Sequence, residues 1–109
     1  MNGVSSIQLS IERELKNLVK TGKYYLGSRR SLEAVKRGEA KLLIIAENTP
    51  PEIRERALYY AKLSNTPVIV FKGSTTDLGL AVGKPFTVSM IAVLDEGTAR
   101  LLDVRSLQG

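Results

Sequence analysis

Apolar positions along this chain follow two patterns, one typical of helices and one typical of buried strands. Between Ile7 and Val19, apolar residues return at a helical spacing, with charged residues between them. Lys41–Ala46 instead reads KLLIIA, a nearly continuous apolar run of the kind found in strands covered on both faces. The alternation of such segments predicts an α/β domain with helices on both faces of one sheet.

The same reasoning gives bounds for the other elements. Helices are expected over Ile7–Val19, Ser28–Arg37, Pro50–Asn65 and Ser74–Gly83. Strands are expected over Tyr24–Leu26, Lys41–Ala46, Pro67–Phe71 and Phe86–Leu94. Beyond Leu94, Glu96 and Gly97 predict a turn toward the segment ARLLDV.

Helix starts and stops have their own signals. Ser28 is the expected N-cap of the second helix, and Gly38 is expected to close it. Thr49 is the expected N-cap of the third helix, with Pro50 in its first position and Glu52 completing a capping box.

Three loops are the expected binding region. Parallel strands joined by crossovers are the default topology for such alternating units, and open sheets bind ligands beyond their strand ends. The loops that this rule singles out are Gly27–Arg30, Glu47–Thr49 and Gly83–Phe86.

Length and composition narrow the class of protein. Residues 1–109 are predicted to form a single domain, in which residues 1–10 are an extension that could be disordered. The chain has no cysteine and no histidine, which excludes disulfides and removes the commonest general base and metal ligand. The start of the chain lacks the regions of a signal peptide, and no apolar run could span a membrane. We therefore expect a soluble, cytosolic protein.

A small-molecule enzyme is the main alternative from another functional class. The α/β layout permits one, and Asp77, Glu47 and Lys41 are titratable. However, the chain has no P-loop lysine motif and no GxGxxG fingerprint. The sequence therefore favours a protein without enzymatic activity, catalytic residues, metal ions, cofactors or a small-molecule substrate.

Positive charge is concentrated in one part of the sequence. The segment from Lys20 to Lys41 has seven basic and two acidic residues, which accounts for the whole net charge of +5. Such a run is often only a solvated face, but a neutral body with one basic patch is typical of a polyanion binder. Arg29 and Arg30 follow the expected start of a helix, where the dipole disfavours cations, so a bound anion would reconcile them with their position.

Individual loop residues have both a binding interpretation and a structural one. Gly27 could admit a phosphate or simply make a tight turn. Asn48 could contact a base edge or be a turn residue before a helix. Phe86 could stack on a base or begin a strand in the core, where alternation would place it with Val88 and Met90. The pattern alone leaves these alternatives open.

A family resemblance covers these loops. The sequence from Thr21 to Asp95, and above all GSRRS, KLLIIAENTP and YYAKLSNTPV, resembles the L-thirty-e family of archaeal and eukaryotic large-subunit ribosomal proteins. That family belongs to a wider group of three-layer α/β/α proteins, related to L-seven-Ae, that bind kink-turn RNA. The resemblance implies a three-layer sandwich with a single small mixed sheet.

The resemblance also implies roles for particular residues. The turn residues are expected at the kink, Asn48 on a base and Phe86 stacked on an extruded base. Apart from the resemblance, Lys84 is expected to bind RNA as part of the Phe86 loop, and Arg37 is expected to contact a phosphate through its charge. The turn residues are Gly27, Ser28, Arg29, Arg30 and Ser31. Thr87 departs from the family pattern, which removes the expectation of a second basic contact after Phe86.

The expected function is therefore that of a structural constituent of the large ribosomal subunit that binds kink-turn ribosomal RNA in the cytoplasm. Neighbouring ribosomal proteins are expected as further partners, and a membrane is not. The alternative within RNA binding is a kink-turn core protein of a small ribonucleoprotein particle or an RNA-processing complex.

Overall fold

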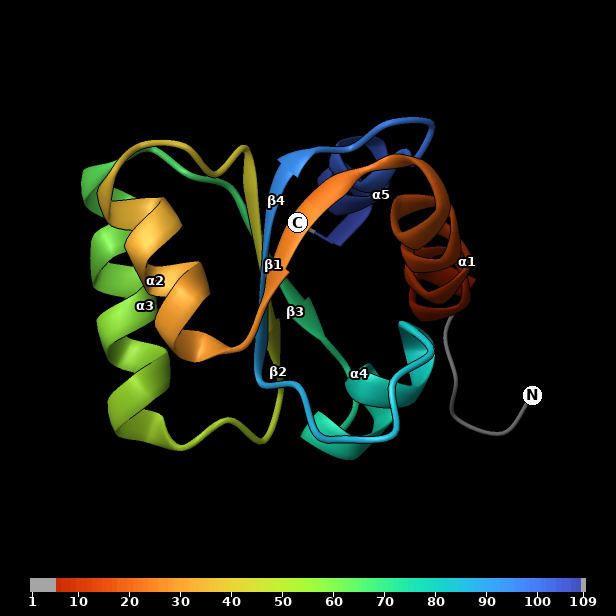
Figure 1. The fold of residues 1–109 in the computed structure, drawn as a ribbon, viewed down its shortest axis with the longest axis horizontal. Helices are drawn as coiled ribbons and strands as arrows, with labels where there is room; N and C mark the ends of the chain where they lie inside the picture. Colours follow the sequence, from red (N-terminus) through yellow and green to blue (C-terminus); the bar gives the residue numbers. More distant parts are fainter. Residues whose placement is uncertain (1–5, 109) are drawn as a thin grey trace.

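The computed structural model describes residues 6–108 and shows a mixed sheet between two layers of helices (Figure 1). The four strands are β1 (Lys23–Leu26), β2 (Leu42–Ala46), β3 (Val68–Phe71) and β4 (Met90–Asp95), in the order β1-β4-β2-β3. β2 and β3 are parallel, whereas β4 is antiparallel to both of its neighbours. The predicted three-layer fold and mixed sheet are confirmed, and the parallel default does not hold for β4.

Helices cover both faces of the sheet. α2 (Ser28–Lys36) and α3 (Pro51–Leu63) lie on one face, and α1 (Ser6–Thr21), α4 (Thr75–Ala81) and α5 (Leu101–Gln108) lie on the other (Figure 1). Each layer has its own buried cluster: Leu32, Val35 and Ala57 belong to the first, and Leu15, Leu78 and Leu101 to the second. All five residues of β2 are buried, as its apolar run predicts.

Strand register brings particular loops to one edge of the sheet. Leu26 at the end of β1 pairs with Ile91, and Ile45 near the end of β2 pairs with Met90. Because β4 runs against both strands, the loops that follow β1 and β2 meet the loop that precedes β4. This edge lies at the bottom of Figure 1.

The ends of several elements differ from expectation. β4 begins at Met90 rather than Phe86, because the residues before it form a loop. α5 follows the predicted turn at Glu96 and Gly97 and was not expected as a helix. Of the possible extension over residues 1–10, residues 1–5 lie outside the described residues and the remainder is the first part of α1. Within the described range, every helix is too short or too polar to cross a membrane.

Both predicted caps at the strand-to-helix loops are wrong. The N-cap of α2 is Gly27, with Ser28 already helical, and the N-cap of α3 is Pro50. Neither cap residue makes a side-chain hydrogen bond. Thr49 is instead buried, and its hydroxyl donates to the carbonyl of Ser89, 3.2 Å away.

Candidate nucleic-acid interface

Three loops are joined at the edge of the sheet where β4 begins. The backbone N–H of Gly27 donates to the carbonyl of Met90 at 2.8 Å. On the other side, the N–H of Ala46 donates to the carbonyl of Ser89, also at 2.8 Å, and the Thr49 hydroxyl donates to the same oxygen. Through these bonds, the loops after β1 and β2 are both attached to the segment that leads into β4.

The turn between β1 and α2 presents an uncapped helix start. Gly27 has a φ of 97°, a conformation that side chains disfavour, so glycine is needed here. α2 has no acidic residue in its first turn, and Arg29 and Arg30 are exposed there. Free N–H groups at a helix start, together with two guanidinium groups, favour an anion such as phosphate.

Ser31 does not share this surface. Its side chain is fully buried, and its hydroxyl oxygen has no hydrogen-bond partner among the described residues. Ser31 lies on the inner side of α2, toward the sheet, with Leu32 and Val35, and its contact with RNA stays a prediction. Gly27, Ser28, Arg29 and Arg30 remain at the surface or half-buried.

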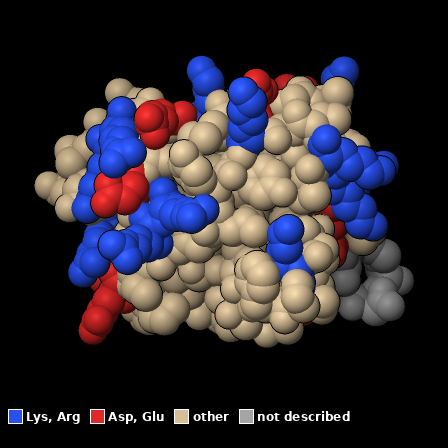
Figure 2. Space-filling model, in the orientation of Figure 1, with Lys and Arg blue, Asp and Glu red and all other residues tan. Residues whose placement is uncertain are grey.

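Arg37 lies at the other end of α2 from the turn. It is the C-cap residue, and its guanidinium is 4.0 Å from the carboxylate of Glu33. Figure 2 shows Lys and Arg side chains gathered on the side of the molecule that α2 and α3 cover, with acidic side chains among them. The basic run of the sequence does not form one patch, because Lys23 and Lys41 lie at the opposite edge of the sheet from the three loops.

Asn48 is held in one orientation by α4. Its side-chain oxygen Oδ1 accepts a hydrogen bond from the backbone N–H of Thr75 at 2.8 Å. The residue is exposed, and within the described chain its Nδ2 group donates to no acceptor. The side chain is thus both a structural link between two loops and an outward-facing donor.

Phe86 lies outside the sheet with 56% of its surface exposed. Val88, two residues later, is buried, and its N–H donates to the carbonyl of Thr75 at 2.9 Å. The strand alternation that would group Phe86 with Val88 does not apply, because β4 starts only at Met90. Lys84, on the same loop, is half-buried.

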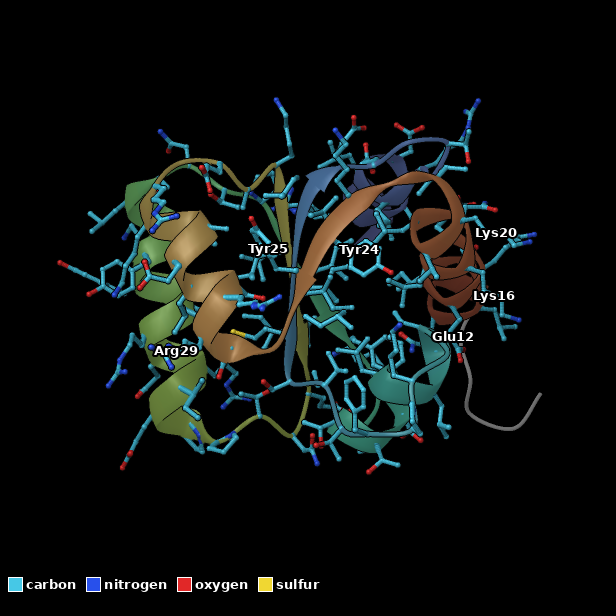
Figure 3. All side chains as sticks on the ribbon, viewed as in Figure 1. Glu12, Lys16, Lys20, Tyr24, Tyr25 and Arg29 are labelled. Carbon is cyan, nitrogen blue, oxygen red and sulfur yellow. The ribbon has the colours of Figure 1, made fainter. Side chains whose placement is uncertain are left out.

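A shallow hollow of about 660 Å³ runs along α2 and was not anticipated from the sequence. Its lining includes Tyr25, Arg29, Arg30, Glu33 and Arg37. Figure 3 shows Tyr25 pointing from β1 toward α2, while the neighbouring Tyr24 points toward α1. Neighbouring side chains of a strand point to opposite faces of the sheet, so Tyr24 and Tyr25 were bound to face different helix layers. The sequence did not show which layer covers which face.

The sequence is similar to those of known ribosomal proteins. Residues 10–103 match the model of the family described as "Ribosomal protein L7Ae/L30e/S12e/Gadd45 family". A protein of Aeropyrum pernix named "Large ribosomal subunit protein eL30" is 54% identical over 87% of this chain and 95% of its own length. Proteins of the same name from Saccharolobus solfataricus and Methanocaldococcus jannaschii are 44% and 42% identical, over 93% and 88% of this chain and 94% and 87% of their own lengths.

The names of these relatives place them in the large ribosomal subunit and name no enzymatic activity. The match covers the three loops and all four strands of the sheet. The chain belongs to the ribosomal protein L7Ae/L30e/S12e/Gadd45 family.

Proposed function

We propose that this protein is a constituent of the large ribosomal subunit that binds kink-turn ribosomal RNA through the edge where β4 begins. The observation that carries this proposal is the joining of three loops at one edge, because these loops include uncapped N–H groups, an exposed amide and an exposed phenylalanine. The names of its relatives support the ribosomal setting.

Each loop supplies a different contact. The turn at Gly27–Arg30 binds phosphate, because the helix start and both arginines attract negative charge. Asn48 recognises a base by donating from Nδ2, since its oxygen is already used by Thr75. Base edges with free carbonyl or ring-nitrogen acceptors fit this arrangement. Phe86 stacks on an unpaired base.

A kink-turn fits this set of contacts better than a straight duplex. The major groove of A-form RNA is too deep and narrow for side chains to read its base edges, whereas bends and bulges expose unstacked bases to aromatic and amide side chains. A basic surface alone would bind any RNA, and its affinity would fall with salt.

A gel-shift comparison tests the proposal. The protein is titrated with a kink-turn RNA and with a straight duplex of equal length and base composition, at physiological salt. We expect tight binding of the kink-turn and weak binding of the duplex. Equal affinity for both would reduce the protein to a general polyanion binder.

The cellular setting is tested separately. A constituent of the large subunit should co-sediment with cytoplasmic large subunits after a high-salt wash. Sedimentation with a smaller particle, together with selective kink-turn binding, would instead favour the core of a small ribonucleoprotein or an RNA-processing complex.

A further inference from the structure

Gly79 lies in the interior of α4, where helix stability alone would favour another residue. Glycine is among the least favourable residues within a helix, and α4 has only seven residues. Gly79 is buried, and its α-carbon faces the backbone of the loop that contains Phe86. A β-carbon at position 79 would collide with the carbonyl oxygen of Phe86 and lie 3.1 Å from its carbonyl carbon. The glycine therefore permits a close approach between helix and loop.

The backbone carbonyl of Gly79 holds the same loop. It accepts a hydrogen bond from the N–H of Lys84 at 2.9 Å, while the N–H of Gly83 donates to the carbonyl of Leu80 at 3.0 Å. These two bonds form a Schellman motif that ends α4 and starts the loop. The loop thus leaves α4 at Lys84 and returns to touch it at Phe86, with both contacts on Gly79.

The start of α4 positions Asn48, the other residue proposed to contact a base. The backbone of Thr75 donates to Oδ1 of Asn48 and accepts from the N–H of Val88. A capping box formed by Ser74 and Asp77 fixes this end of the helix. One short helix therefore holds Asn48 at its first turn and the Phe86 loop at its last.

We infer that Gly79 is a positioning residue for RNA binding, which sets the place of the Phe86 ring through contact with its backbone. This inference rests on the proposed function for its RNA readout, but its structural part does not need RNA. A side chain at position 79 must push the loop away, because the colliding atom belongs to backbone and cannot rotate aside.

A tryptophan reporter tests the structural part. The chain has no tryptophan, so Phe86→Trp gives a single fluorescent probe on the loop. Adding Gly79→Ala should shift its emission and change its quenching by acrylamide. Adding Leu80→Ala, at a side chain 67% exposed on the same helix, should change neither. An unchanged spectrum with Gly79→Ala would overturn the inference.

Kink-turn binding tests the functional part by a double-mutant cycle. Gly79→Ala should lower affinity about 5- to 150-fold, the range expected for loss of one stacked base. In a Phe86→Ala background, Gly79→Ala should cause no further loss, because the ring that it displaces is absent. A full additional loss in that background would show that Gly79 acts elsewhere and would overturn the inference.

A second pair of variants covers the case in which Gly79→Ala fails to fold. Lys84→Pro removes the N–H that binds the Gly79 carbonyl, and Lys84→Ala keeps it while removing the same charge. The proline variant should bind the kink-turn more weakly than the alanine variant; equal affinity would contradict the inference. If the unmodified protein binds kink-turn and duplex equally, the proposed function fails, and the tryptophan spectra still decide the role of Gly79.

Discussion

The two phenylalanines of this chain occupy opposite environments. Phe71 in β3 is 1% exposed and belongs to the core beneath α1 and α4, whereas Phe86 lies on a loop before β4. The same residue type therefore provides folding energy at one position and is available for a ligand at the other.

Substitution of each phenylalanine separates these roles. Phe86→Ala should leave the free energy of unfolding nearly unchanged, because the exposed ring is not packed in the core. It should cost about 1–3 kcal/mol of kink-turn binding, because the ring is proposed to stack on a base. Phe71→Ala should lose about 3–5 kcal/mol of folding stability, because it leaves a cavity. Thermal unfolding of both variants, beside RNA titrations, measures the difference. A large drop in melting temperature for Phe86→Ala with unchanged affinity would remove Phe86 from the interface.

Asn48 can be altered on its outward side alone. Asn48→Asp keeps an oxygen for the N–H of Thr75 and places a charge that the start of α4 favours, but it replaces the Nδ2 donor with an acceptor. We expect folding stability to be retained and kink-turn affinity to fall by an amount on the order of 1–3 kcal/mol. Asn48→Ala, the matched control, should lose both the Thr75 bond and the RNA contact. Undiminished binding by Asn48→Asp would exclude base recognition by its amide.

The sequence located these residues but not their orientation. Whether Phe86 faces core or solvent depends on where β4 begins. That point follows from contacts with other segments: the N–H of Val88 donates to the carbonyl of Thr75, and the carbonyl of Ser89 accepts hydrogen bonds from Ala46 and Thr49. Asn48 proved to be both a turn residue and an outward amide, so the two interpretations of this position were not exclusive.

At the scale of elements, helix ends were more predictable than helix starts. Gly38, Asn65 and Gly83 close α2, α3 and α4 with positive φ angles of 72°, 53° and 73°, and each end was expected from local sequence. The starts of α2 and α3 were not, because the backbone there turns without a side-chain cap and the hydroxyl of Thr49 bonds to a distant strand. A helix end can be predicted from nearby residues when its hydrogen bonds are made within the same turn of the chain.

α5 is attached to α1 through a carboxylate. Glu14 accepts hydrogen bonds from the N–H of Arg100 at 2.9 Å and from the amide of Asn17 at 3.0 Å. Burial raises the pKa of Glu14, but these hydrogen bonds and the charges of Arg13 and Arg100 outweigh it and hold the pKa below the usual 4.5. The charged form therefore stabilises the fold.

The stability contributed by Glu14 should depend on pH. It should be fully present above pH 4.5, the unfolded value, and should be lost as the pH falls through the lowered folded value. Glu14→Gln removes this titration and should cost about 0.3–1 kcal/mol near neutral pH, as for a charge at a helix start. Urea unfolding of both proteins between pH 7 and pH 3 should show the difference shrinking toward acid. A difference constant over this range would contradict the role of the charge.

At the scale of the whole molecule, the order of the strands determines the interface. Hydrophobic pattern predicted four strands and two helix layers, yet it could not show that the last strand lies between the first and second. That placement brings the three loops together. The sequence could therefore name the loops of the site but could not show that they lie next to one another. Arg37 and Lys41 belong to the same basic run but lie away from the loops, because Arg37 caps the far end of α2 and Lys41 bonds to Val93 near the end of β4.

Charge on the far end of α2 should act without regard to RNA shape. Arg37→Ala is expected to weaken kink-turn and duplex binding alike and to lower the slope of log affinity against log salt by about one unit, as for one lost phosphate contact. Glu33→Gln, which removes the carboxylate 4.0 Å from Arg37, should not lower affinity for either RNA. Titrations at several salt concentrations measure both. A selective loss of kink-turn binding by Arg37→Ala would instead assign it to shape recognition.

The central position of β4 also determines when during synthesis the RNA-binding site can form. A ribosome synthesises β1, β2 and β3 before β4, and within the described chain β1 pairs with β4 alone. A nascent chain that ends before Ser89 has an unpaired first strand, and it lacks the two carbonyls, of Ser89 and Met90, that join the loops after β1 and β2. Recognition of RNA must therefore wait until the segment through β4 has emerged, so a half-made copy cannot occupy the site that the finished protein is to bind.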